Sequence, residues 1–185
     1  MLLPVETFQS LAGDFAMMDR VVSWSFALAL AGFLLFMSFQ KFFGLDPNPV
    51  FGLIEARSGI GFFEPGMRYI TAVLELAAAA LVVWPRTRIR GAQLGLLVAI
   101  GAIVFHLTPW LGWQVPRLEP LSQALAQGLT AAQIDALNLG TDKGAMFLLA
   151  IAIAALAAAS IFVERSQARA KVSAGATPPP RASFA

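Results

Sequence analysis

The chain has 185 residues, of which 58% are hydrophobic and only 13% are charged. Soluble domains average roughly 45–50% apolar and about 25% charged residues. A protein of this size with so few charged side chains cannot cover its surface with them, and it cannot bury all of its apolar side chains. We therefore do not expect a water-soluble globular protein. A mean hydropathy of +0.71 indicates a chain whose solvent is mostly lipid.

The residue inventory excludes several kinds of redox and metal site. The chain has no cysteine, so it has no disulfide, no thiol nucleophile, no thiolate ligand and no attachment point for a c-type haem. A single histidine rules out a bis-histidine haem or a histidine metal cluster within one chain. We therefore expect no metal and no intrinsic cofactor. The net charge of +2 does not indicate a nucleic-acid partner.

The first predicted element covers residues 1–20. This segment lacks the basic start, the continuous apolar stretch and the cleavage site of a signal peptide. Phe8, Leu11 and Phe15 recur at helical spacing, with acidic residues among the polar positions. We predict an amphipathic helix that lies in the cytoplasmic interface of the membrane.

Four later stretches are long and apolar enough to cross a bilayer, which requires about 20 mostly apolar residues. They cover residues 21–43, 67–84, 91–110 and 143–163. Backbone polar groups in lipid must be satisfied within each segment, so each stretch predicts a helix. Together they predict an all-α fold, an integral membrane four-helix bundle over residues 21–163.

Two connections between the spans are too apolar to be plain spacers. Residues 44–66 predict a short helix or a re-entrant segment that folds back on the bundle. In residues 111–140, Thr130 and Gln133 form a capping-box pattern, which predicts a short helix ending near Asn138. We expect these connections to form a helical cap over the outer end of the bundle, or a docking surface.

The distribution of basic residues indicates the orientation in the membrane. On the expected inner side lie Arg20, Arg86, Arg88, Arg90, Arg165, Arg169, Lys171 and Arg181. An even number of spans places both termini on that side, so we expect a multi-pass protein of the bacterial cytoplasmic (inner) membrane with cytoplasmic N- and C-termini. Residues 164–185, which include three consecutive prolines, predict a disordered cytoplasmic tail.

Ionisable residues within spanning segments are costly in lipid, so each is a candidate for function. Glu75 lies near the middle of the second span, and His106 lies near the outer end of the third. An antiparallel bundle brings further polar residues to the same outer end. The candidate ligand-binding residues are Lys41, Arg68, Glu75, His106 and Asp142.

Two interpretations of these residues remain open. In the functional one, a polar pocket beneath the cap holds a quinone head group, a lipid head group or a transferable proton, with Glu75 and His106 as the catalytic candidates. In the structural one, Glu75 pairs with Lys41, Arg68 or His106 to fix helix register, while Lys41 and Arg68 extend toward water. Polar contacts between membrane helices are commoner than catalysis, which favours the structural interpretation.

Several short motifs resemble those of one family of small bacterial membrane proteins. They are KFFG at residues 41–44, RYITAVLEL at 68–76, WPR at 84–86, GA at 91–92, AIVFHLT at 102–108 and DKGAMF at 142–147. With these motifs the chain resembles the DoxX-like family of four-helix proteins over residues 32–163. It departs from the family at Ser38, where glycine is frequent, and in the longer connection over residues 111–140. The resemblance implies quinone-linked electron transfer, with Lys41, Glu75 and His106 as characteristic polar positions.

The expected function is that of an accessory or assembly subunit of a membrane electron-transfer complex, respiratory or photosynthetic. A chain without cysteine and with a single histidine has too few ligands to carry electrons itself. We therefore expect a non-catalytic subunit that positions quinone or lipid and whose partners are other membrane subunits and lipid. The alternative is a quinone-linked oxidoreductase subunit in which Glu75 and His106 transfer protons.

Overall fold

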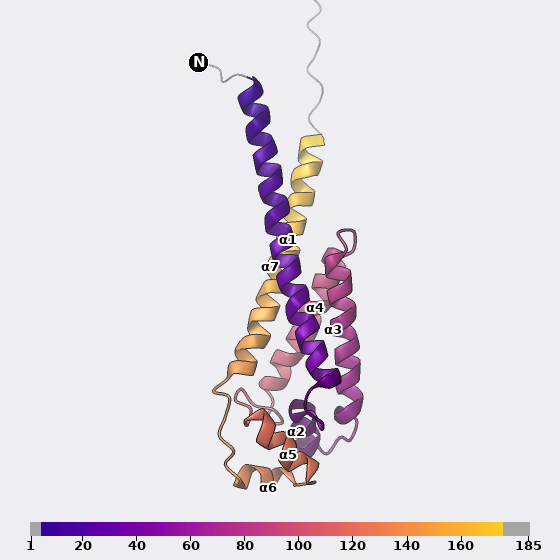
Figure 1. Cartoon of the computed structure of the whole chain (residues 1–185), viewed down its shortest axis with the longest axis vertical. Helices are drawn as coiled ribbons and strands as arrows, with labels where there is room; N and C mark the ends of the chain where they lie inside the picture. Colours follow the sequence, from indigo (N-terminus) through magenta and orange to yellow (C-terminus); the bar gives the residue numbers. More distant parts are fainter. Residues whose placement is uncertain (1–4, 176–185) are drawn as a thin grey trace, which may run out of the picture.

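A computed structural model describes residues 5–175 of the chain (Figure 1). These residues form seven α-helices and one π-helical turn, and no strand. The elements are α1 (Val5–Phe43), α2 (Pro49–Ser58), η1 (Phe63–Met67), α3 (Arg68–Val83), α4 (Arg88–His106), α5 (Leu118–Ala126), α6 (Ala131–Ala136) and α7 (Ala145–Gly175). The all-α prediction is confirmed.

Four long helices form an antiparallel bundle. Helix α1 packs beside α3 and α7, and α4 packs beside the same two helices, so α1 and α4 lie diagonally across the bundle. The stretches long and apolar enough to cross a membrane are Met17–Phe43, Phe63–Val83, Arg88–His106 and Ala145–Ala170. They coincide with the four predicted spans, and the chain is a multi-pass membrane protein.

Small side chains let the four helices approach closely. The buried core of the bundle consists of Ala27, Leu30, Ala31, Leu34, Ala78, Ala79, Val82, Ala92, Ala99, Ile153 and Ala157. Gly91 is required where α3 and α4 meet, because a Cβ atom at this position would lie 2.4 Å from the backbone nitrogen of Val82. Alanine and glycine therefore set the spacing of the helices.

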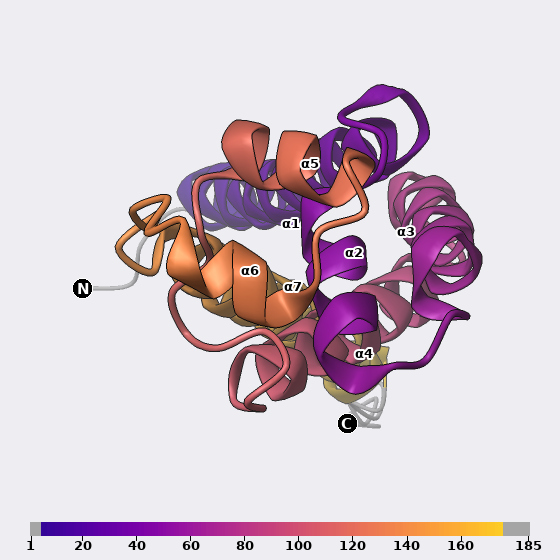
Figure 2. The same cartoon turned by 90° about the horizontal axis from the view of Figure 1, so that it is seen from below.

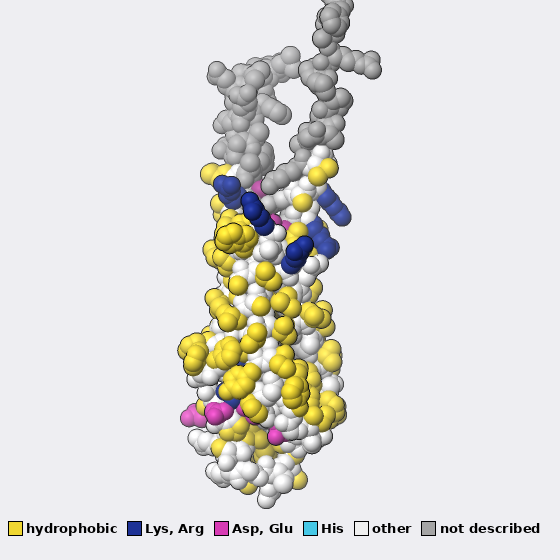
Figure 3. All heavy atoms as spheres, turned by 90° about the vertical axis from the view of Figure 1, so that its right-hand side faces the viewer, with side chains coloured by type: hydrophobic (Ala, Val, Ile, Leu, Met, Phe, Trp, Pro, Cys, Tyr) yellow, Lys and Arg dark blue, Asp and Glu magenta, His cyan; other side chains and the backbone are white. Residues whose placement is uncertain are grey.

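Apolar side chains also cover the outside of the bundle. Large hydrophobic residues are exposed on every span, for example Phe36, Val73, Leu97 and Leu148. In Figure 3 hydrophobic side chains cover the middle of the molecule, while Lys and Arg gather toward one end and Asp and Glu toward the other. We call the first the basic end and the second the capped end. A continuous apolar surface of this kind suits acyl chains rather than water.

The capped end is closed by the short helices α2, α5 and α6, which lie across the bundle (Figure 2). These helices and the adjoining loops have a hydrophobic core of their own, formed by Leu53, Ile54, Leu111, Val115, Leu121, Ala124 and Ile134. The predicted capping box starts α6, with side-chain bonds in both directions between Thr130 and Gln133. The predicted helical cap is confirmed.

Three predicted boundaries change. Residues 5–20 are helical, as predicted, but α1 continues through Arg20 without a break. Helix α4 ends at His106 rather than at residue 110, because Pro109 disfavours helical backbone in the residue before it. The prediction of disorder is wrong for residues 164–175, which extend α7. This segment contains no proline, is rich in good helix formers and continues a helix that has already nucleated. The three prolines lie outside the described residues.

Candidate functional site

A buried ion pair joins α1 to α3 near the capped end. Lys41, in the last turn of α1, donates from Nζ to both carboxylate oxygens of Glu75, each at 2.9 Å. The same Nζ donates to the main-chain carbonyl of Met37 at 3.3 Å. Lys41 is 7% exposed and Glu75 is 5% exposed. An unpaired charge here would be costly, so each residue supplies the counter-charge that the other needs.

Arg68 begins α3 beside this pair but is directed away from Glu75. Its Nε donates to the main-chain carbonyl of Lys41 at 2.6 Å. Its Nη1 donates to the carboxylates of Asp46 and Glu64, each at 2.6 Å. The acids of the connection between α1 and α3 lie nearer to the start of α3 than Glu75 does, two turns along the helix. Arg68 is only 2% exposed, and neither it nor Lys41 extends toward water as the structural interpretation expected.

Glu64 connects this group to the cap. Its Oε1 accepts hydrogen bonds from Arg68 and from the main-chain N–H of Asn48, the latter at 3.2 Å. Asn48 in turn caps α2, because its side chain accepts from the N–H groups of Val50 and Phe51 at 3.1 Å and 3.3 Å. The buried Oε2 of Glu64 has no hydrogen-bond partner among the described residues. The start of α2 is thereby fastened to the bundle through charged groups.

His106 lies at the end of α4 and contacts the loop that follows it. Its Nδ1 lies 2.8 Å from the main-chain carbonyl of Gly112, so this nitrogen is the donor. Its ring packs against Phe147 of α7, with 5.5 Å between the ring centroids. With 5% exposure, the imidazole is buried between α4, α7 and the base of the cap.

Asp142 precedes α7 and holds the chain at this point. Its Oδ1 accepts from the main-chain N–H groups of Val115 and Gly144, each at 2.9 Å, and its Oδ2 accepts from that of Met146 at 2.8 Å. Burial by itself would raise the pKa of Asp142, but these three hydrogen bonds, with a contribution from His106, hold its pKa below the ordinary value. The carboxylate thus stabilises the start of α7 and holds the segment before α7 against Val115.

All five predicted site residues lie at the capped end, but they form two groups. Arg68, Lys41 and Glu75 are connected to one another, whereas His106 and Asp142 surround the loop after α4. Among residues 5–175, no hydrogen bond or ion pair joins the two groups. The pairing of Glu75 with Lys41 is one of the alternatives of the structural interpretation. Binding of a ligand at either group stays a prediction.

A third buried charged group, which the sequence did not indicate, lies at the basic end. Arg88, counted above among the charges of the inner side, is 4% exposed. Its Nη1 donates to the hydroxyl of Ser23 on α1 and to Glu164 on α7, the latter at 2.9 Å. Its Nε donates to the carbonyl of Val82 on α3 at 3.1 Å. The guanidinium carbon also lies 4.3 Å from the ring centroid of Trp24.

Arg88 therefore contacts all three other spanning helices from its place on α4. Ser23 completes the group by donating its hydroxyl proton to Glu164. The Nη2 atom of Arg88 is buried without a hydrogen-bond partner in the described part of the chain. In the sequence, three arginines alternate at residues 86, 88 and 90, and nothing in that pattern marks the middle one as buried. The available signal was a polar residue near the basic end of the first spanning stretch, Ser23, and an acidic one near the basic end of the last, Glu164.

These sites and this fold define a class of protein. Among the residues whose side chains the structure describes, no three His, Cys, Asp or Glu side chains are placed to hold a metal ion. The class is a multi-pass α-helical membrane protein, a capped four-helix bundle with buried charged groups at both ends. Comparisons with known protein families, with curated proteins and with solved structures give no match for this chain.

Proposed function

We propose that this chain is a non-catalytic accessory or assembly subunit of a membrane electron-transfer complex, of the DoxX-like type. The proposal rests on the observation that buried charged side chains of the spans form ion pairs with one another. Glu75 has both oxygens on Lys41, and Arg88 is bound to Glu164. Groups engaged in this way hold helices together and leave little capacity to bind or protonate a substrate.

The cap supports a role in attachment to partner subunits. It has its own hydrophobic core and is fastened to the bundle through Arg68 and Glu64. At the same end, Ile60, Phe62 and Trp113 remain exposed. Exposed aromatic and aliphatic side chains on a well-ordered surface favour contact with another protein. The lipid-facing spans offer further surface on which neighbouring subunits can pack.

The charge distribution supports the bacterial cytoplasmic membrane with both termini inside. Arg86 is exposed on the α3–α4 connection and Arg90 in the first turn of α4, and Arg165 and Arg169 are exposed near the end of α7. All of these lie at the basic end, together with both termini of the described chain. Loops rich in Lys and Arg remain in the cytoplasm, which puts the capped end outside.

The direct test is to solubilise membranes gently and to size the complex that contains this chain, with a visible absorption spectrum of the same fraction. We expect migration with a larger assembly whose spectrum contains the bands of a redox cofactor. Migration alone, or as a plain homo-oligomer, under conditions that preserve respiratory complexes would overturn the proposal.

A second candidate, a quinone-linked oxidoreductase subunit, is favoured by the burial of two ionisable side chains, Glu75 and His106, toward the capped end of the bundle. Glu75→Gln and His106→Phe distinguish the two functions in the assembled complex. A loss of quinone-linked turnover of about 100-fold or more, with assembly intact, supports proton transfer by these groups. Unchanged turnover in both variants removes this candidate.

A further inference from the structure

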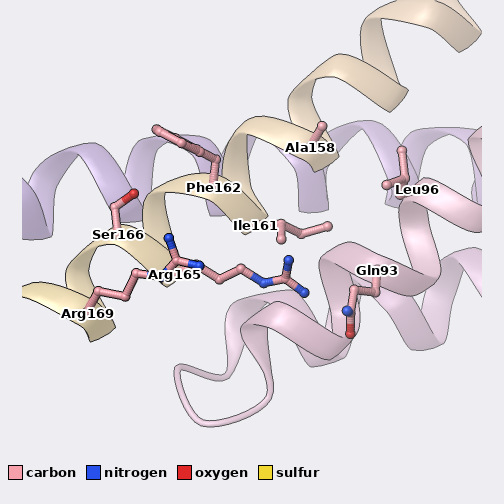
Figure 4. A pocket seen from close by; sticks show the side chains of 8 residues that line it. All are labelled: Gln93, Leu96, Ala158, Ile161, Phe162, Arg165, Ser166 and Arg169. Carbon is pink, nitrogen blue, oxygen red and sulfur yellow. The ribbon is translucent and has the colours of Figure 1, made fainter. Parts of the chain in front are cut away.

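A groove lies on the surface between α4 and α7 (Figure 4), toward the basic end. Gln93, Arg165 and Arg169 line its polar part, and Leu96, Ala158 and Ile161 line its apolar part. We call it the α4–α7 groove. It is an open surface hollow with a volume of about 480 Å³.

The polar part of the groove gathers positive charge. Arg165 and Arg169 are four positions apart, so they lie on the same face of α7. In Figure 4 the side chain of Arg165 extends from α7 toward Gln93 of α4. Within the described residues neither arginine takes part in an ion pair. Two neighbouring guanidinium groups with an amide beside them suit an anion with several oxygens, such as a phosphate.

The two parts of the groove lie at different depths in the membrane. Eleven residues separate Ala158 from Arg169, which is about 16 Å along the helix axis. The apolar stretch of α7 gives way to charged residues from Glu164 onward, so we expect Arg165 and Arg169 at the level of the lipid head groups. Ala158 lies correspondingly deeper, among acyl chains. Helix α4 runs in the opposite direction, and accordingly Gln93 faces the arginines while Leu96 faces the apolar part.

We propose that the α4–α7 groove binds an anionic phospholipid. Its phosphate lies on Arg165 and Arg169, and one acyl chain lies along Leu96, Ala158 and Ile161. A free phosphate would use the arginines and leave the apolar part empty, and a partner helix would use the apolar part without needing two adjacent cations. A phospholipid matches both parts of the groove, because its phosphate fits the two arginines and its acyl chain fits the apolar part deeper in the membrane. The proposal does not depend on the function proposed above.

The test uses the delipidated full-length protein in detergent, titrated with phosphatidylglycerol and observed by native mass spectrometry. Phosphatidylcholine serves as the neutral lipid for reference, and the native chain is expected to bind it about tenfold more weakly. The double variant Arg165→Gln/Arg169→Gln is expected to lose about tenfold in affinity for phosphatidylglycerol. The matched control Arg86→Gln/Arg90→Gln removes the same charge from exposed positions outside the groove and is expected to change that affinity by less than about threefold.

A third variant, Ala158→Trp, tests the apolar part. Ala158 is exposed, so the indole fills the groove without disturbing the core, and we expect a loss of phosphatidylglycerol comparable to that of the arginine variant. An equal loss of phosphatidylglycerol affinity in the arginine variant and in its control would show that general surface charge causes the effect. This result would overturn the proposal. Displacement of the lipid by millimolar inorganic phosphate, or unchanged lipid binding in Ala158→Trp, would also overturn it in favour of a phosphate site. Loss of assembly size in Ala158→Trp with lipid binding intact would identify a partner helix as the occupant instead.

Discussion

Lys41 and Glu75 stand 34 residues apart in the chain, yet the Lys41 ammonium lies 2.9 Å from both oxygens of the Glu75 carboxylate. This contact fixes the end of α1 against α3 at the capped end of the bundle. At the basic end, Arg88 bonds to Glu164 and thereby ties α4 to α7. The bundle thus carries an interhelical ion pair near each end, with an alanine-rich core between them.

Removing one member of the Lys41–Glu75 pair is expected to be costly. In Glu75→Gln the Lys41 ammonium stays buried without a counter-charge, so we expect the free energy of unfolding to fall by about 3–5 kcal/mol. Replacing both residues, in Lys41→Met/Glu75→Leu, leaves no buried charge and should recover most of this loss. Denaturant unfolding in detergent micelles measures both values. A double variant no more stable than the single one would show that the lost pairing is not the cause.

Arg88 and Arg90 provide a comparison within one turn of α4. Arg88→Met leaves Glu164 without its cation and removes the contact with Trp24, so we expect a loss of about 2–4 kcal/mol in unfolding free energy. Arg90→Met, at an exposed position, is expected to stay within about 0.5 kcal/mol of the native chain. Thermal unfolding in micelles checks the difference. Similar values for the two variants would contradict the structural role of Arg88.

Two glycines of α4 should respond differently to alanine. At Gly91 the added Cβ atom would lie 2.4 Å from the backbone nitrogen of Val82, and main-chain atoms cannot move aside cheaply. Gly91→Ala is therefore expected to destabilise the protein by about 1–3 kcal/mol. At Gly101 no atom outside the nearby backbone of α4 lies within 4 Å of the added Cβ, so Gly101→Ala should be neutral or slightly stabilising. The melting temperatures of the two variants give the test, and equal effects would contradict the close approach of α3 and α4.

Asp142 should make stability depend on pH in the acid range. Its pKa is lower in the folded protein than in the unfolded chain. The stabilisation is therefore fully present above the ordinary pKa of about 3.9 and is lost as the pH falls through that value toward the lower folded pKa. We expect the native chain to lose more thermal stability than Asp142→Asn between pH 6 and pH 3. Parallel pH profiles for the two proteins would rule out this role.

The orientation in the membrane can be measured directly because the chain has no cysteine of its own. Leu137→Cys places a thiol at an exposed position of the capped end, and Arg90→Cys places one at the basic end. In spheroplasts, an impermeant maleimide is expected to label the first variant at once and the second only after permeabilisation. The reverse pattern would invert the proposed topology.

The residues of the candidate site could be predicted from the sequence, but the contacts that these residues make could not. Topology alone brings Lys41, Arg68 and His106 to one end, because successive spans of an antiparallel bundle alternate in direction. The choice of partner for each charge could not be read from the sequence. Arg68 bonds to Asp46 and Glu64 rather than to Glu75, because the connection after α1 folds back over the start of α3. When acidic residues of a loop and of a helix can both pair with the same arginine, their distance in the folded structure decides which of them does.

The sequence by itself determined the class of fold, the four spans, the capping box at Thr130 and the position of the cap. Each of these depends on local rules, since a bilayer requires about 20 apolar residues in a hydrogen-bonded segment and a capping box acts within one turn. Only the tertiary structure decided that Arg88 is buried and that the α4–α7 groove lies beside Arg165. Membrane helices are apolar on every side, so their periodicity does not show which face turns inward, and the rotation of each helix is set by packing against its neighbours.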